Sequence, residues 1–214
     1  MNNYSLFENM DEKEIHNLMN CLKADERIYQ KGDIILSFNE STQIVGIMQK
    51  GIACLVSINK EGEKSIIDYY ETNDIFGKQF SPNINANLYY ILAKTECCVK
   101  FCEYEKMITC CHKNCNKHIK LINNLILISN RKSQIHINIL SQRTVRNKLI
   151  TYFNYISEQT NSKKIKSPLS LSDLADYISV DRSAMMREIG KMNDDKIIIS
   201  KGRNIELIQN YQIE

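Results

Sequence analysis

The chain has 214 residues, 25% of them charged, and a formal net charge of +3. That length can bury a core in one large or two small domains. No continuous apolar run is long enough to cross a bilayer, and the polar start, MNNYSLFENMDEKE, lacks the basic-then-apolar order of a signal peptide. The composition therefore excludes a membrane-spanning chain and predicts a cytoplasmic protein.

The N-terminal half changes from helical to β-rich patterning. Residues 4–23 have apolar side chains at helical spacing, which predicts one or two short amphipathic helices. From Arg27 onward, β-rich runs alternate with polar turns, and several glycines fall at those turns. Many short strands with regular turns predict a β-sandwich or barrel. The runs are RIYQKGDIILSF, QIVGIMQKGIACLVSI, KSIIDYYETNDIFG and ANLYYILAKTECCVKF.

The segment that follows has a repeat typical of a coiled-coil seam, with spacings of four and three residues. Its members are Cys115, Ile119, Ile122, Ile126, Ser129, Ser133, His136 and Leu140. A seam of this length predicts a homodimer contact along one helix, and a buried helix of a monomer is the alternative. A neighbouring apolar stripe is available to pack on the β-rich domain: Leu121, Leu125, Ile128, Ile135 and Ile139.

Residues 169–192, LSLSDLADYISVDRSAMMREIGKM, have the pattern of two short helices joined by a tight turn. Ser170 is a natural N-cap, and Asp173 three residues later completes a capping box. Ser179 and its neighbour form the turn, and Asp181 caps the second helix. Apolar residues recur at helical spacing as the buried stripe of that helix: Met185, Ile189 and Met192.

The opposite face of the second helix is polar and cationic. Arg182 stacks with Met186, and Ser183 with Arg187, because positions four apart share one side of a helix. Such a surface fits a DNA major groove, where the planar fork of arginine can donate two hydrogen bonds to a guanine edge. The alternative is an amphipathic helical hairpin with a solvated charged face.

The stretch from Lys196, KIIISKGRNIELI, predicts a β-hairpin directly after this helix, with Gly202 at its turn. Such a winged arrangement supports DNA binding, because Lys201 and Arg203 at the hairpin tip would lie near phosphates, together with Ser170. Residues 140–214 contain 12 Lys+Arg against 9 Asp+Glu, and residues 1–139 contain 16 of each. The excess positive charge therefore lies in the predicted DNA-binding end.

The β-rich runs RIYQKGDIIL, IVGIMQKGIACL, EGEKSII and NDIFGKQF resemble the cyclic-nucleotide-binding β-roll, which has glycines at these turns and a Pro-Gly-Asp-x-Phe-Gly element before its ligand pocket. Joined to ILSQRTVRNKLITYF and the winged helix-turn-helix, they make essentially the whole chain similar to the Crp/Fnr superfamily. The resemblance implies an α+β fold in three parts. These are a β-roll (jelly-roll-like) sensor domain at 1–110, a dimerisation helix at 111–139 and a winged helix-turn-helix domain at 140–214.

The resemblance also identifies an effector region. In family members that bind cAMP, a glutamate after Phe-Gly holds the ribose, and an arginine with a hydroxyl residue holds the cyclic phosphate. Here Lys78 replaces the glutamate, and Asn87 and Leu88 replace the phosphate pair. The phosphate would lose charge-assisted hydrogen bonds worth about 1.5–3 kcal/mol each, which argues against ordinary cAMP binding. The expected pocket residues are Phe76, Gly77, Lys78, Gln79, Asn87, Leu88, Tyr89 and Ser129.

Eight cysteines without a secretory signal favour free thiols or metal ligands over a disulfide framework. Thiolate and imidazole bind zinc, iron–sulfur clusters and haem. The iron–sulfur members of the family carry their cysteines near the N-terminus, where this chain has only Cys21. Inert thiols and a haem, iron–sulfur or redox site both stay open. The candidate ligands are Cys97, Cys98, Cys102, Cys110, Cys111, His112 and Cys115.

The sequence thus predicts a homodimeric transcription regulator that binds a palindromic operator in double-stranded DNA and responds to a signal at the β-roll or the dimer helix. Thr144 or Arg146 would help orient the DNA-binding domain, and activation would require a contact with RNA polymerase. No nucleophile–base arrangement, phosphate loop or carboxylate pair indicates an enzyme. The alternatives are a thiol, metal or haem protein in which the cysteine clusters carry the function, and a ligand-independent DNA binder.

Overall fold

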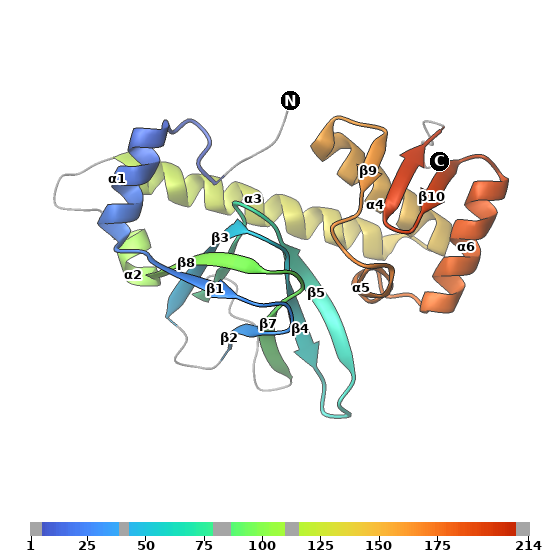
Figure 1. Ribbon diagram of the computed structural model, residues 1–214, viewed down its shortest axis with the longest axis horizontal. Helices are drawn as coiled ribbons and strands as arrows, with labels where there is room; N and C mark the ends of the chain where they lie inside the picture. Colours follow the sequence, from blue (N-terminus) through green and yellow to red (C-terminus); the bar gives the residue numbers. More distant parts are fainter. Residues whose placement is uncertain (1–5, 39–42, 79–86, 110–115, 209–214) are drawn as a thin grey trace. The chain divides into compact units, whose positions relative to one another are not determined.

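The computed structural model describes residues 6–38, 43–78, 87–109 and 116–208 (Figure 1). The chain forms two compact units, one of which is Tyr4–Ser129 and the other of which contains Asn130–Glu214. The division falls within α3, Asn116–Ser141, so the helix predicted to mediate dimerisation contributes to both units. In the described parts of the chain, no helix is long and apolar enough to cross a membrane.

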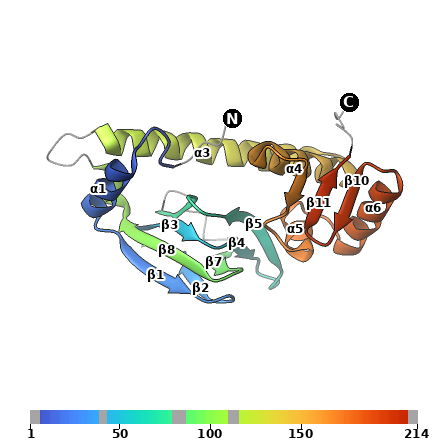
Figure 2. The same ribbon diagram turned by 45° about the horizontal axis from the view of Figure 1, so that its top comes forward.

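The first unit is a β-sandwich of two antiparallel four-stranded sheets (Figure 2). One sheet has the order β1-β8-β3-β6 and the other β2-β7-β4-β5. This confirms the predicted β-roll. The strands are β1 Asp25–Tyr29, β2 Ile34–Ser37, β3 Ile44–Lys50, β4 Ala53–Ile58, β5 Lys64–Tyr70, β6 Ile75–Gly77, β7 Leu88–Ala93 and β8 Cys97–Glu103.

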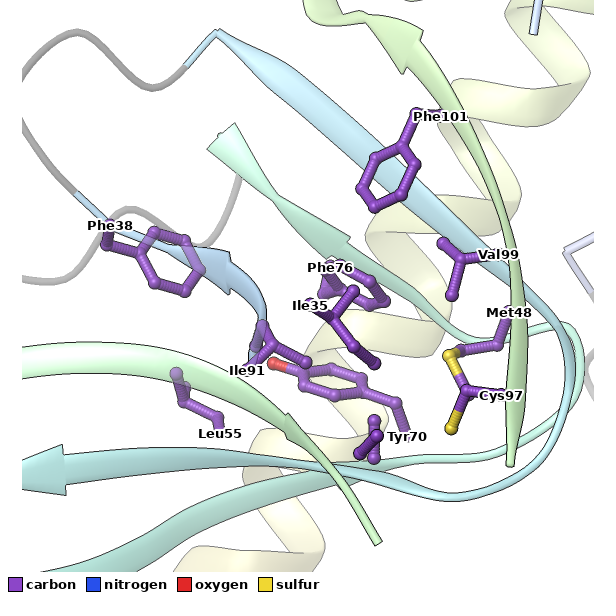
Figure 3. Packing of buried hydrophobic residues seen from close by; sticks show 12 residues of the cluster. Ile35, Phe38, Met48, Leu55, Tyr70, Phe76, Ile91, Cys97, Val99 and Phe101 are labelled. Atoms are coloured by element: carbon purple, nitrogen blue, oxygen red, sulfur yellow. The ribbon is translucent and has the colours of Figure 1, made fainter. Parts of the chain in front are cut away.

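Two apolar cores hold this unit together. The first contains residues from both sheets, and the rings of Tyr70 and Phe76 lie within it at a centroid distance of 5.4 Å (Figure 3). The second joins the outer face of β3 and β8 to α1, Glu12–Leu22, α2, Tyr104–Ile108, and α3. Leu121, Leu125 and Ile128 of α3 belong to this second core, as the apolar stripe predicted. One or two helices were expected in residues 4–23, and the described part of this segment contains one helix, α1.

The second unit contains the predicted winged helix-turn-helix. Its helices after α3 are α4 Val145–Thr160, α5 Leu171–Tyr177 and α6 Arg182–Asp194. Its antiparallel sheet has the order β10-β11-β9, formed by β10 Ile198–Lys201, β11 Asn204–Leu207 and β9 Lys164–Lys166. The hairpin β10–β11 turns at Gly202, whose φ of +61° suits glycine. β9 was not predicted, because three residues are too few to show an alternating pattern.

Candidate DNA-binding interface and effector region

The helix-turn-helix is fixed by local hydrogen bonds at each helix end. Ser170 caps α5 by accepting from the Asp173 amide at 3.2 Å, and its hydroxyl also donates to the Asp173 carboxylate at 2.6 Å. Asp181 caps α6 by accepting from the Ala184 amide at 2.8 Å. Ser179 adopts the left-handed conformation, φ +52°, that turns the chain between the helices. These positions are the caps and the turn that the sequence predicts.

α6 has one buried face and one exposed face. Met185, Ile189 and Met192 are buried, as expected from their spacing. The four residues of the predicted DNA-binding face are all exposed on the other side: Arg182, Ser183, Met186 and Arg187. The structure therefore presents two guanidinium groups, a hydroxyl and a thioether together on the N-terminal half of one helix.

Arg146 connects α4 to α6. Its Nε donates to Glu188 at 2.5 Å, and its Nη1 lies 2.8 Å from the carboxylate of Asp195 at the C-cap of α6. The hydrogen bond to Glu188 is the main cause of the raised pKa of Arg146. The two ion pairs join α4 to the middle and to the C-cap of α6. That Thr144 or Arg146 helps to orient the DNA-binding domain stays a prediction. Thr144 is the N-cap of α4 and accepts from the Asn147 amide at 3.1 Å.

The wing places some basic residues differently from the expectation. Lys201 is exposed at the end of the hairpin, as predicted. Arg203 is half-buried, and its Nη1 donates to the carbonyl of Pro168 at 3.2 Å, so the guanidinium connects the wing to the segment before α5. Lys166 is exposed on β9, in one cross-strand row with Asn204 and Lys201. Lys166 was not predicted, and its signal in the sequence is the alternation of Lys164 and Lys166 with the buried Ile165.

His136 contacts a residue of its own unit. Its Nε2 lies 2.8 Å from the carbonyl oxygen of Tyr177, and its ring stacks on the Tyr177 ring at a centroid distance of 4.1 Å. These contacts join α3 to the end of α5. The place of His136 in a dimer seam stays a prediction.

The other seam residues lie along α3 with different exposures. Ile119 and Ile126 are each 51% exposed, Leu140 is also exposed, and Ser133 faces solvent. Ile122 and Ser129 are half-buried. α3 thus exposes apolar side chains at predicted seam positions, while Leu121 and Leu125 of the neighbouring stripe are buried in the β-roll unit. Ile135 and Ile139 of that stripe lie in the second unit, contrary to the expectation that the whole stripe packs on the β-rich domain.

The described effector-region residues differ in their burial. Phe76 is fully buried, and a Cβ at Gly46 would come within 2.5 Å of its ring, so glycine there makes room for this side chain. Gly77 has φ +122°, and a Cβ there would lie 2.3 Å from the Ile44 carbonyl oxygen, so the Phe-Gly element needs its glycine. Lys78 and Tyr89 are half-buried and Leu88 is exposed; Gln79 lies outside the described residues.

Asn87 uses its amide locally: Nδ2 donates to the hydroxyl of Tyr89 at 3.4 Å. Neither group carries the cation that a cyclic phosphate needs at this place. The described contacts agree with the expectation that ordinary cAMP recognition is absent, which itself stays a prediction.

The first cysteine cluster alternates across β8. Cys97 is buried in the core between the sheets, and Cys102 is buried on the opposite face among helix residues. Burial raises the pKa of Cys97, Cys98 and Cys102, the last to about 11, which keeps these thiols protonated and weakens them as ligands. Across the residues the structure describes, no group of three or more His, Cys, Asp or Glu could hold a metal ion. Cys110, Cys111, His112 and Cys115 lie outside those residues.

Comparison with known proteins gives both sequence and structural matches. Residues 26–114 match the family model of the cyclic nucleotide-binding domain. The chain is 19% identical to the transcriptional activator protein FnrL of Cereibacter sphaeroides over 197 residues, 86% of this chain and 77% of FnrL.

Two solved structures have the same fold. FixK2 from Bradyrhizobium japonicum matches with a TM-score of 0.67 at 18% identity, covering 87% of this chain and 93% of FixK2. CprK complexed with OCPA matches with a TM-score of 0.70 at 18% identity, covering 93% of this chain and 92% of CprK.

The chain therefore combines a cyclic nucleotide-binding domain with a winged helix-turn-helix. In this combination it resembles the Crp/Fnr superfamily, and the resemblance seen in the sequence is confirmed.

Proposed function

We propose that the protein is a cytoplasmic, homodimeric transcription regulator that binds a specific palindromic DNA operator through α6. The exposed face of α6 carries this proposal, because it presents Arg182 and Arg187 on a helix that is capped, buried on its other side and held by Arg146. Arginine pairs with the O6 and N7 acceptors of guanine in the major groove. Ser183 stands where the family usually has a glutamate, so an acceptor for cytosine is missing and the operator differs from the usual half-site.

Dimerisation is supported by the exposed apolar residues of α3, chiefly Ile119 and Ile126. A second copy of the same helix would cover them and leave the stripe at Leu121 and Leu125 in its own β-roll core. Two-fold symmetry then requires two half-sites about 34–36 Å apart, one turn of DNA. A signal at the β-roll or along α3 would act by changing how the two helices pack.

The signal is not ordinary cAMP, since Lys78, Asn87 and Leu88 replace the groups that hold the nucleotide. CprK, which has the same fold, is complexed with OCPA. Haem and iron–sulfur clusters stay candidates through the cysteine cluster at 110–115. An absorption spectrum and metal analysis of protein purified without oxygen separate these cases: a Soret or iron–sulfur band at near-stoichiometric iron indicates a metal sensor, and colourless protein that binds its operator indicates an organic ligand or none.

Selection of DNA duplexes from a random library tests the proposal. The protein should enrich one palindrome, and Arg187→Ala should weaken binding to it by about 1–3 kcal/mol while changing affinity for random duplexes much less. Lys13→Ala is the matched control, because it removes one exposed positive charge from α1 of the β-roll. Equal losses on selected and random DNA would make Arg187 a phosphate contact, and a library without enrichment would contradict sequence-specific binding.

A further inference from the structure

The exposed face of α6 contains a row whose side chains become smaller along the helix. Arg182, Met186 and Gly190 follow one another at four-residue intervals, so they lie on one line of the surface, and all three are exposed. The beginning of a recognition helix normally reaches base edges, and its later turns approach the walls of the groove. The middle member of this row is apolar and the last has no side chain.

Met186 is 38% exposed, although α6 completes its core contact with Met185, Ile189 and Met192. The Met186 side chain is therefore not needed for the packing of α6 against its core. Its neighbours on the exposed face are Arg182, Ser183 and Arg187, so it is an apolar group within a polar surface. The only apolar group that base pairs present in the major groove is the 5-methyl group of thymine.

Gly190 lies inside α6, where glycine destabilises a helix relative to alanine. It has no left-handed φ, and a Cβ added there would meet nothing within 4 Å. Neither backbone conformation nor packing within the described chain explains this glycine. A close approach of another molecule to the helix backbone does, because it would fill the space that a Cβ occupies.

We propose that Met186 contacts the methyl group of a specific thymine in each half-site and that Gly190 lets the DNA strand approach the α6 backbone closely. This inference rests on the proposed function and adds a specificity contact to it. It predicts an operator in which an A·T pair stands beside the pair recognised by an arginine, and it explains why the row ends in a residue that costs helix stability.

Deoxyuridine tests the methyl contact directly, since uracil keeps every hydrogen-bonding group of thymine and lacks only its methyl group. The selected operator is prepared with deoxyuridine replacing one thymine at a time. One thymine in each half-site should stand out, with an affinity loss of about fourfold per half-site, the value for one buried methyl or methylene group at about 0.8 kcal/mol. Met186→Ala should lose sensitivity to this replacement, and Ser183→Ala should keep it.

Gly190→Ala tests the close approach, and its two effects have opposite signs. Removing a helical glycine should raise the unfolding midpoint of the second unit by about 4–8 °C, if it responds as a domain of about 60–100 residues. The same variant should bind the operator at least about tenfold more weakly, because the new methyl group meets the DNA strand. Loss of binding then cannot be attributed to misfolding.

The outcomes separate the inference from the proposed function. If no DNA sequence is enriched, the proposed function fails and this inference with it. If the protein binds its selected operator but no thymine responds to deoxyuridine, the inference alone is overturned. A Gly190→Ala variant that is more stable and binds as tightly as the natural chain also overturns it.

Discussion

Replacing Arg146 with methionine tests whether ion pairs hold the recognition helix in place. Methionine keeps the aliphatic part of the side chain and removes the guanidinium that contacts Glu188 and Asp195. Arg146 lies in the first turn of α4, where the helix dipole disfavours a positive charge. Its position therefore depends on the two carboxylates of α6 and its C-cap.

The exposure of the partners sets the expected magnitude. The side chains of Arg146 and Glu188 are 27% and 17% exposed, while that of Asp195 is 49% exposed. Exposed ion pairs contribute about 0.2–1 kcal/mol, and breaking a fully buried one costs about 3–5 kcal/mol. We expect a coupling energy of about 1–2 kcal/mol for Arg146 with Glu188 and less than about 1 kcal/mol for Arg146 with Asp195.

Double-mutant cycles measure these couplings by urea unfolding, with Arg146→Met combined in turn with Glu188→Gln and Asp195→Asn. Arg146→Met should also weaken binding to the selected operator more than binding to random duplexes, because a loosened α6 no longer fixes its base contacts. Coupling energies below about 0.3 kcal/mol in both cycles, together with unchanged operator affinity, would refute the reasoning.

Three further predictions concern the sensor unit and α3. Burial raises the Cys102 pKa from 9.0 to about 11, so between these pH values the folded chain retains a proton that the unfolded chain releases. The free energy of unfolding should therefore fall between pH 9 and about 11, by up to about 1.4 kcal/mol per pH unit. Cys102→Ala should reduce this slope. Burial lowers the pKa of His118 in α3 below its ordinary 6.5. The stability that depends on the neutral ring is therefore present above pH 6.5 and is lost as the pH falls through the folded-state pKa. Urea titrations from pH 7 to 5 should show this loss in the natural chain and a smaller loss in His118→Gln. Ile126→Asp should dissociate the dimer in sedimentation measurements, whereas Leu127→Asp, at a similarly exposed position outside the seam, should leave it associated; equal effects would argue against the seam.

Local patterns predicted much of the second unit. The caps at Ser170 and Asp181 and the stripe at Met185 and Ile189 depend only on residue type and spacing, and the structure has all of them. The pairing of Arg146 with Glu188 was not predictable, because 42 residues separate the partners and nothing in the local pattern selects Glu188 over Asp194 of the same helix. The half-burial of Arg203 depends on the backbone before α5, to which the sequence gives no clue.

The β-roll shows the same limit of sequence reasoning. Its strands and turns follow from β-rich runs and glycines, and the Phe76-Gly77 element is required by a close approach at Ile44. The cysteine cluster of β8 looked like one candidate ligand group in the sequence. In the strand, Cys97 and Cys102 face opposite sides, so adjacency along the chain does not bring these two thiols together.

The stoichiometry of the protein on its selected operator tests the central claim most directly. Sedimentation of the complex with a duplex containing one palindrome should give two chains per duplex, and a duplex containing a single half-site should bind far more weakly. One chain per duplex, with equal affinity for the half-site and the palindrome, would contradict a dimeric regulator whose two α6 helices bind successive turns of the major groove.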